Sequence, residues 1–223
     1  MCGRYTAGIL VERVRKILPL DEIQCELTLR YNIAPTQMAP VILNQGKTVL
    51  KNLRWGLMPF WATDPGIGAR MINARAETVR EKPAFRHSFK HKRCLVLADS
   101  FYEWQTIPET ARKQPMRILR PDEAPFVFAG LWDVWKKPGG IELGTYTIIT
   151  CAANHWMRPI HERMPVIMKP ENYGQWLDPK NEDIAELAKL LVPYPENELT
   201  AYAVGTMVNN PKFDDPRCIE RQI

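Results

Sequence analysis

The chain has 223 residues, of which 45% are hydrophobic and 25% are charged, values typical of a globular protein that exclude wholesale disorder, a collagen-like repeat and a coiled coil. No apolar run reaches the roughly 18 to 20 residues of a membrane-spanning helix, so we expect no membrane insertion. The formal net charge of +5 is compatible with a polyanionic partner without establishing one.

Hydrophobic periodicity predicts an amphipathic helix at residues 8–18 and, after a polar acidic loop, a series of short strands. The strands are rich in β-branched and aromatic residues and are separated by proline, glycine and charged turns. We expect them at 39–43, 48–55, 94–98, 101–105, 115–120, 126–132, 145–153, 164–168 and 199–204. Two further helices are expected at 170–177 and 182–192.

This order of elements predicts an α+β fold with a large, mostly antiparallel, barrel-like sheet and a few flanking helices. The length fits one large domain or two small ones. We find no internal repeat and no linker rich in Gly, Ser or Pro, so we expect a single domain over 1–223.

The five cysteines are odd in number and irregularly spaced, which fits neither a disulfide framework nor a CxxC zinc site. No motif for a metal or an organic cofactor is present, so we expect neither. Because the first residues, MCGRYTAG, contain no secretory leader, we expect a cytoplasmic protein, associated with the nucleoid if the chain is bacterial.

A basic segment at 80–93, REKPAFRHSFKHKR, holds six Lys and Arg against a single acid. Phe85 and Phe89, four residues apart, give it a helical apolar face. Two interpretations stay open: a solvated helix held by these two rings, or a surface that follows DNA phosphates. His87 and His91 have a spacing that suits a metal, but no third ligand is near in sequence, so we expect no metal site.

The start of the chain offers an unusual nucleophile. Aminopeptidases remove Met1 when the second residue is small, which would give Cys2 a free α-amine beside its thiol. An α-amine has a pKa of about 7.7 to 8.0 against about 10.4 for lysine, so its nucleophilic fraction at neutral pH is roughly 400-fold larger. With an aldehyde, the amine forms a Schiff base and the thiol closes a thiazolidine. With an amide or ester, the thiol alone is the nucleophile.

Polar residues at three other places have side chains suited to ligand binding or acid–base catalysis. Asn73 and Arg75, two apart in MINARAET, project from one face if extended and suit an anionic or carbonyl-bearing ligand. Glu103 lies in the strand-like DSFYEWQ, where spacing favours a solvent-facing side chain over a buried acid of raised pKa. His161 precedes an apolar strand and can act as an acid or base near neutrality, although most lone histidines are structural.

Eight motifs, in their order along the chain, resemble the SRAP family, abasic-site processing proteins first described as SOS response-associated peptidases. They are MCGRY, RYNIAPTQ, WGLMPFW, INARAET, ADSFYEW, AGLWD, IITCAA and IHERMP. The resemblance runs from Cys2 to about Val208 and implies a single SRAP-type domain that acts in DNA repair. It implies binding of single-stranded DNA and capture of abasic sites by Cys2 in a thiazolidine crosslink, with AP-lyase and autopeptidase activities also within the family's range.

The same resemblance implies roles for individual residues. Glu103 would transfer protons during ring opening and Schiff-base formation, and His161 would be the acid–base histidine, also tied to strand incision or crosslink reversal. Asn73 would orient the sugar. The implied DNA-binding residues are Arg4 and Arg75 at phosphates, Pro35 and Trp61 as a wedge between bases, Asn32 in the pocket lining and Thr150 near the bound backbone. The loop between Trp61 and Asn73 is longer than in compact bacterial members.

Two alternatives stay open. The first is a thiol autopeptidase in which His161 and Glu103 activate Cys2. The second is a non-covalent binder of single-stranded DNA that keeps the groove without the chemistry. In the leading interpretation the partner is single-stranded DNA with abasic sites, and we expect a monomer.

Overall fold

The structure is a computed structural model that describes residues 2–8, 14, 16, 18–136, 139–140 and 142–222. Most of the helix expected at 8–18 lies outside the described residues. The α+β class, with a mostly antiparallel, barrel-like sheet and few helices, is confirmed.

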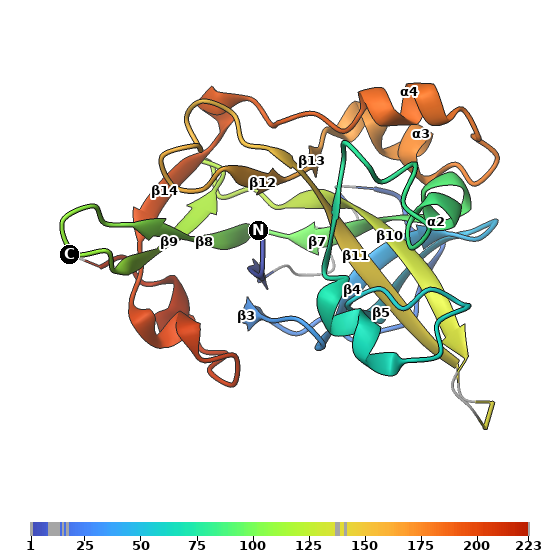
Figure 1. The fold of residues 1–223 in the computed structure, drawn as a ribbon, viewed down its shortest axis with the longest axis horizontal. Helices are drawn as coiled ribbons and strands as arrows, with labels where there is room; N and C mark the ends of the chain where they lie inside the picture. Colours follow the sequence, from blue (N-terminus) through green and yellow to red (C-terminus); the bar gives the residue numbers. More distant parts are fainter. Residues whose placement is uncertain are drawn as a thin grey trace.

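Five strands close into a barrel (Figure 1). They are β4 (Met38–Asn44), β5 (Thr48–Trp55), β7 (Arg93–Ala98), β10 (Phe126–Lys136) and β11 (Glu142–Ala152). Neighbours in the order β11-β10-β7-β4-β5 pair antiparallel, and a parallel pairing of β5 with β11 closes the ring. The apolar run of β7 is buried at every residue, as a strand covered on both faces requires.

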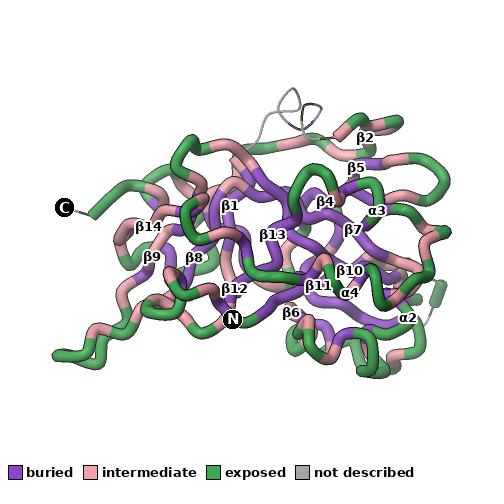
Figure 2. Tube along the Cα trace, turned by 90° about the horizontal axis from the view of Figure 1, so that it is seen from above, coloured by how far each residue is buried: buried purple, intermediate pink, exposed green. Residues whose placement is uncertain are grey.

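A second, five-stranded antiparallel sheet extends from the barrel in the order β14-β9-β8-β1-β3. Its strands are β1 (Arg4–Ala7), β3 (Arg30–Ile33), β8 (Ser100–Thr106), β9 (Lys113–Leu119) and β14 (Thr200–Ala203). The rings of Tyr5 and Phe101 pack against Phe128 of the barrel at centroid distances of 5.8 and 6.0 Å. These contacts join the two sheets through one hydrophobic core, and Figure 2 shows buried residues along β7 and β10 of the barrel.

Short strands border these sheets. They are β2 (Glu22–Ile23), β6 (Asn73–Arg75), β12 (Arg163–Pro165) and β13 (Ile167–Met168). β6 and β12 both pair with β11, parallel and antiparallel respectively. The strand expected at 164–168 is thus split, because β12 pairs with β11 whereas β13 pairs with β10.

The helices are short. Those that fall wholly within the described residues are α2 (Arg86–His91), α3 (Tyr173–Leu177), α4 (Ile184–Lys189), and the 3-10 helices η1 (Pro65–Arg70), η2 (Pro170–Asn172), η3 (Glu196–Glu198), η4 (Thr206–Asn209) and η5 (Pro216–Ile219). The helix expected at 170–177 is confirmed as η2 followed directly by α3, and the helix expected at 182–192 is confirmed in shorter form as α4. Within 80–93 only α2 is helical, since Pro83 disfavours helical backbone at the residue before it and Arg93 already belongs to β7.

Four tryptophans lie in the core, at positions 55, 132, 135 and 176. All five cysteines are free thiols. In the part of the chain that the structure describes, no helix is long and apolar enough to cross a membrane.

Arg93 connects α2 and α3 to the barrel. Its guanidinium, in a residue only 4% exposed, donates hydrogen bonds to the carbonyl oxygens of Phe89, Lys90, Trp176, Asp178 and Asn181. Carbonyls at helix C-termini have no partner within the helix, and here one side chain satisfies several of them. Burial lowers the pKa of Arg93 to about 10.

We expect Arg93→Lys to lower the free energy of unfolding by about 2 to 4 kcal/mol. The lysine ammonium has only three N–H donors and cannot reproduce the planar arrangement of donors on the guanidinium, so several of the carbonyl oxygens lose their partner. Urea unfolding measures the change. A loss below about 0.5 kcal/mol, typical of surface substitutions, would contradict this role.

Candidate active site

The pairing of β1 with β8 places Cys2 near Glu103. Arg4 lies opposite Tyr102 in an antiparallel register, so the residues before Arg4 run beside those after Tyr102. Cys2 is fully buried, and its Sγ lies 4.0 Å from the carbonyl oxygen of Arg4. Burial, and then the negative charge of Glu103, raise the pKa of the Cys2 thiol well above its ordinary value. The thiol is therefore held neutral beside a carboxyl group.

Glu103 is 2% exposed, so the solvent-facing interpretation is wrong. β8 lies between β1 and β9, and its first four residues are all buried, which means that neither face of the strand is open there. Burial disfavours the charged form and raises the pKa of Glu103 to about 7. Near neutral pH this carboxyl group can both accept and donate a proton.

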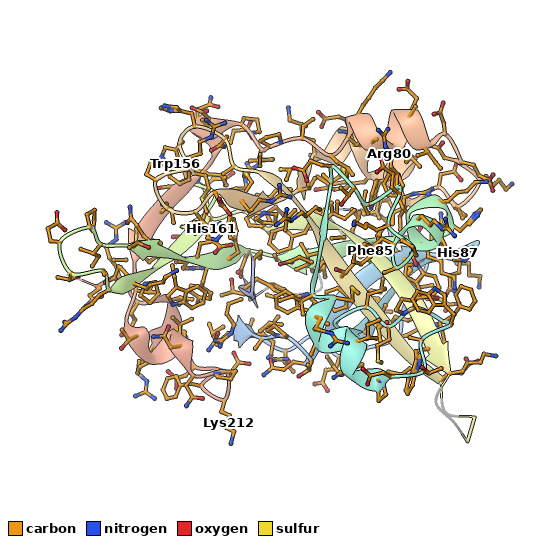
Figure 3. All side chains as sticks on the ribbon, viewed as in Figure 1. Arg80, Phe85, His87, Trp156, His161 and Lys212 are labelled. Carbon is orange, nitrogen blue, oxygen red and sulfur yellow. The ribbon has the colours of Figure 1, made fainter. Side chains whose placement is uncertain are left out.

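His161 faces the carboxyl group of Glu103. Its Nε2 lies 3.8 Å from Oε2 of Glu103, and Figure 3 shows the ring beside β8. The backbone N–H of Arg163 donates to Nδ1 at 2.9 Å, so the neutral ring carries its proton on Nε2, toward the carboxyl group. Burial lowers the pKa of His161, which favours this neutral form.

Asn73 begins β6, opposite Ile148 of β11. Its Nδ2 donates to the carbonyl oxygen of Ile72 at 3.0 Å, while its buried Oδ1 has no hydrogen-bond partner among the described residues. An unsatisfied buried acceptor costs about 1 to 3 kcal/mol, so this oxygen suits a ligand donor. The Ile72 oxygen also accepts from Trp55 Nε1 at 2.9 Å, and the Trp55 ring packs on Tyr5, three residues from Cys2.

Three of the expected DNA-binding side chains reach the surface. Arg75 is exposed, and Ala74 between it and Asn73 is buried, as alternation along a strand requires. Trp61 is 50% exposed. Pro35 is half-buried in the turn that follows β3.

Arg4 and Asn32 instead hold the C-terminal segment 208–213. Arg4 donates to Asn32 Oδ1 at 2.9 Å and to the carbonyl oxygens of Val208 and Asn209. The buried Asn32 donates through Nδ2 to the carbonyl oxygens of Val208, Asn210 and Phe213. A part for Arg4 or Asn32 in DNA binding stays a prediction.

Thr150 is buried, and its carbonyl oxygen and Oγ1 accept from Arg163 Nη2 at 2.7 and 3.3 Å. Sequence reasoning missed Arg163, which also binds Glu77 through two hydrogen bonds of 2.6 and 3.0 Å. The position of Arg163, two residues after His161, could have indicated its role, because the Arg163 N–H orients the His161 ring.

Among the described residues, no group of three or more His, Cys, Asp or Glu is arranged to hold a metal ion. The rings of His87 and His91 lie 5.2 Å apart. His87 contacts Phe60, and His91 Nδ1 lies 3.4 Å from Glu182.

The burial of Glu103 predicts a pH-dependent stability. Its pKa rises from 4.5 to about 7 on folding, so between these pH values the native state binds more protons than the unfolded chain, and stability falls as pH rises through this window. At about 1.4 kcal/mol per pH unit, burial of Glu103 lowers the free energy of unfolding above pH 7 by about 3 kcal/mol.

We expect Glu103→Gln to exceed the wild type in unfolding free energy by about 2 to 3 kcal/mol at about pH 8, and to match it near pH 4. Urea unfolding at both pH values measures this. Equal stability at the higher pH would contradict the raised pKa.

Comparisons with known proteins show which proteins this chain resembles. The family model described as SOS response associated peptidase (SRAP) matches residues 1–211. Abasic site processing protein YoqW of Bacillus subtilis (strain 168) is 46% identical over 224 residues, 99% of each chain. Abasic site processing protein HMCES of Xenopus tropicalis is 34% identical over 264 residues, 98% of this chain and 78% of that protein. A crystal structure of a protein from Bacteroides thetaiotaomicron has a TM-score of 0.86 and 30% identity, covering 100% of both chains.

Proposed function

Because the chain belongs to the SRAP family, we propose that it captures abasic sites in single-stranded DNA as a covalent thiazolidine on Cys2. One observation carries the proposal. The negative charge of Glu103 raises the pKa of the buried Cys2 thiol, and His161 Nε2 lies 3.8 Å from the same carboxyl group. A nucleophile, a carboxyl group of pKa about 7 and a neutral imidazole meet what reversible imine chemistry needs.

The proposed reaction begins after removal of Met1. The Cys2 amine attacks C1′ of the ring-opened abasic sugar to form a carbinolamine, Glu103 gives its proton to the hydroxyl of that carbinolamine, and loss of this hydroxyl as water forms the Schiff base. The Cys2 sulfur then attacks the imine carbon, a C–S bond forms, and the thiol proton moves to the nitrogen. His161, with its proton on Nε2, would assist opening of the sugar ring, and Asn73 Oδ1 would accept a hydrogen bond from the sugar.

Binding must not depend on sequence, because an abasic site has no base to read. Phosphate contacts and stacking on aromatic side chains provide such binding, and the exposed Arg75 and Trp61 suit these two contacts. AP-lyase activity would follow where β-elimination of the Schiff base outruns ring closure.

The peptidase alternative is supported less well. Catalytic cysteines have a lowered thiol pKa, whereas burial raises that of Cys2. Intact mass separates the alternatives: Met1 retained in His161→Ala but absent from the wild type would favour self-processing.

The proposal is tested with a fluorescent single-stranded oligonucleotide carrying one abasic site, analysed on a denaturing gel after heating. We expect an adduct with the abasic oligonucleotide, and none with an intact base or an aldehyde first reduced to the alcohol. An adduct with the reduced site, or none with the aldehyde, would overturn the proposal.

A further inference from the structure

We propose that Asp133 is a positioning residue, which fixes the neighbouring side chains of Phe60 and Trp61 as a surface for unstacked bases beside the lesion. We call these two side chains the aromatic pair. The inference rests on the proposed function, because it assumes that the bound strand is single-stranded DNA.

The aromatic pair stands out on the surface. Phe60 is 54% and Trp61 50% exposed, and adjacent exposed aromatic side chains of this size are typical of binding sites. Stacking of a base on an aromatic side chain contributes about 1 to 3 kcal/mol and tolerates any sequence. A protein that binds DNA around a missing base needs contacts of this kind.

Asp133 anchors the backbone of the pair from the barrel. Its carboxylate lies in β10, in a residue only 1% exposed, and Oδ2 accepts from the backbone N–H of Phe60 at 2.9 Å. Oδ1 accepts from Lys92 Nζ at 2.6 Å and from the N–H of Val134 at 2.8 Å. The buried charge is therefore paired and hydrogen-bonded, as a stable buried carboxylate must be.

Two further bonds fix the same segment on either side of the pair. The N–H of Met58 donates to Thr145 Oγ1 at 2.9 Å, and Trp135 Nε1 donates to the carbonyl oxygen of Ala62 at 2.7 Å. A backbone held at three points within 58–62 loses little conformational entropy on binding, so its side chains bind more tightly than those of an unrestrained loop.

The bonds that anchor the segment involve none of the reactive residues. The Phe60 ring contacts His87 of α2 edge-on, with ring centroids 5.5 Å apart. Figure 3 shows His87 at one end of the molecule and His161 nearer the other. Loosening the segment should therefore change DNA affinity and leave the chemistry at Cys2 intact.

Two measurements test the proposal. Affinity is measured by fluorescence anisotropy with a single-stranded oligonucleotide that carries a tetrahydrofuran in place of the abasic sugar, which binds without reacting. The crosslinking rate is measured at saturating abasic DNA. The variants are Asp133→Ala, Asp133→Asn, Trp135→Phe and Trp61→Ala.

We expect Asp133→Ala to weaken binding about tenfold, equivalent to about 1.4 kcal/mol, with an unchanged crosslinking rate at saturation. Asp133→Asn keeps an acceptor for the Phe60 N–H and should restore most of the affinity. Trp135→Phe removes the bond to Ala62 while keeping an aromatic ring in the core, and should weaken binding about threefold, so it tests the anchoring even if Asp133→Ala fails to fold.

In the Trp61→Ala background, Trp135→Phe should cause a smaller loss of affinity than in the wild type, because only Phe60 of the aromatic pair then remains to be positioned. Additive losses, or a lower rate at saturation with unchanged affinity, would overturn the inference. Failure of the wild type to form any adduct would overturn the proposed function instead, and the affinity measurement would still report on the anchoring.

Discussion

Cys2→Ala will abolish the heat-stable adduct with abasic single-stranded DNA, reducing its yield to that of the base-containing control. Alanine keeps the α-amine but has no thiol, so the Schiff base cannot close to a thiazolidine and hydrolyses. Borohydride added during the incubation reduces the imine to a stable amine, and we expect it to recover an adduct from the variant. Quantitative denaturing gels, with and without borohydride, measure both outcomes.

Cys25→Ala is the matched control, because Cys25 is the one cysteine that is not fully buried in the core. Its adduct yield should equal that of the wild type. A Cys2→Ala protein that still forms the heat-stable adduct without borohydride would contradict the proposed chemistry.

Glu103→Gln will slow crosslinking at saturating DNA by about 10²- to 10⁴-fold, the range typical of general acid–base catalysis. The amide has nearly the same shape but cannot deliver a proton. Since the pKa of Glu103 is raised to about 7, the acid form predominates below that pH and the carboxylate above it. The acid form of Glu103 decreases with pH while the neutral form of the Cys2 amine, with an ordinary pKa of about 7.7 to 8.0, increases, so the wild-type rate should pass through a maximum between about pH 7 and pH 8.

The Gln variant should lack the fall in rate on the alkaline side and keep the rise that the Cys2 amine causes, and single-turnover rates between about pH 5 and pH 9 compare the two proteins. Glu109→Gln, at an exposed position, should retain both the wild-type rate and its pH profile. A Glu103→Gln protein with a wild-type profile would exclude Glu103 as the proton donor.

The sequence predicts the barrel strands well because each has a local pattern of strand-favouring residues bounded by turn residues. The strand expected at 48–55 matches β5 at both ends, since the segment carries Thr48, Val49 and Trp55, residue types favoured in strands, and is bounded by turn residues. β1, β3 and β6 escaped prediction as strands. Each has only three or four residues and depends on a partner distant in the sequence, such as β8 for β1.

The candidate site was predictable in its residue types but not in its arrangement. Glu103 shows why: alternation along one strand cannot reveal that neighbouring strands and the core cover both faces. The contact between Glu103 and His161 joins residues far apart in the chain. Likewise, the bonds of Arg4 to the carbonyls of Val208 and Asn209 depend on a segment some 200 residues away, which no local pattern reports.

Covalent capture by Cys2 is tested by the intact mass of the purified protein before and after incubation with a short abasic single-stranded oligonucleotide. Digestion then locates the linkage. Covalent capture by Cys2 predicts a starting mass without Met1, a gain equal to the oligonucleotide less one water, and a linkage at Cys2. A protein without Met1 that gains no mass, or one whose linkage lies on a lysine, would contradict it.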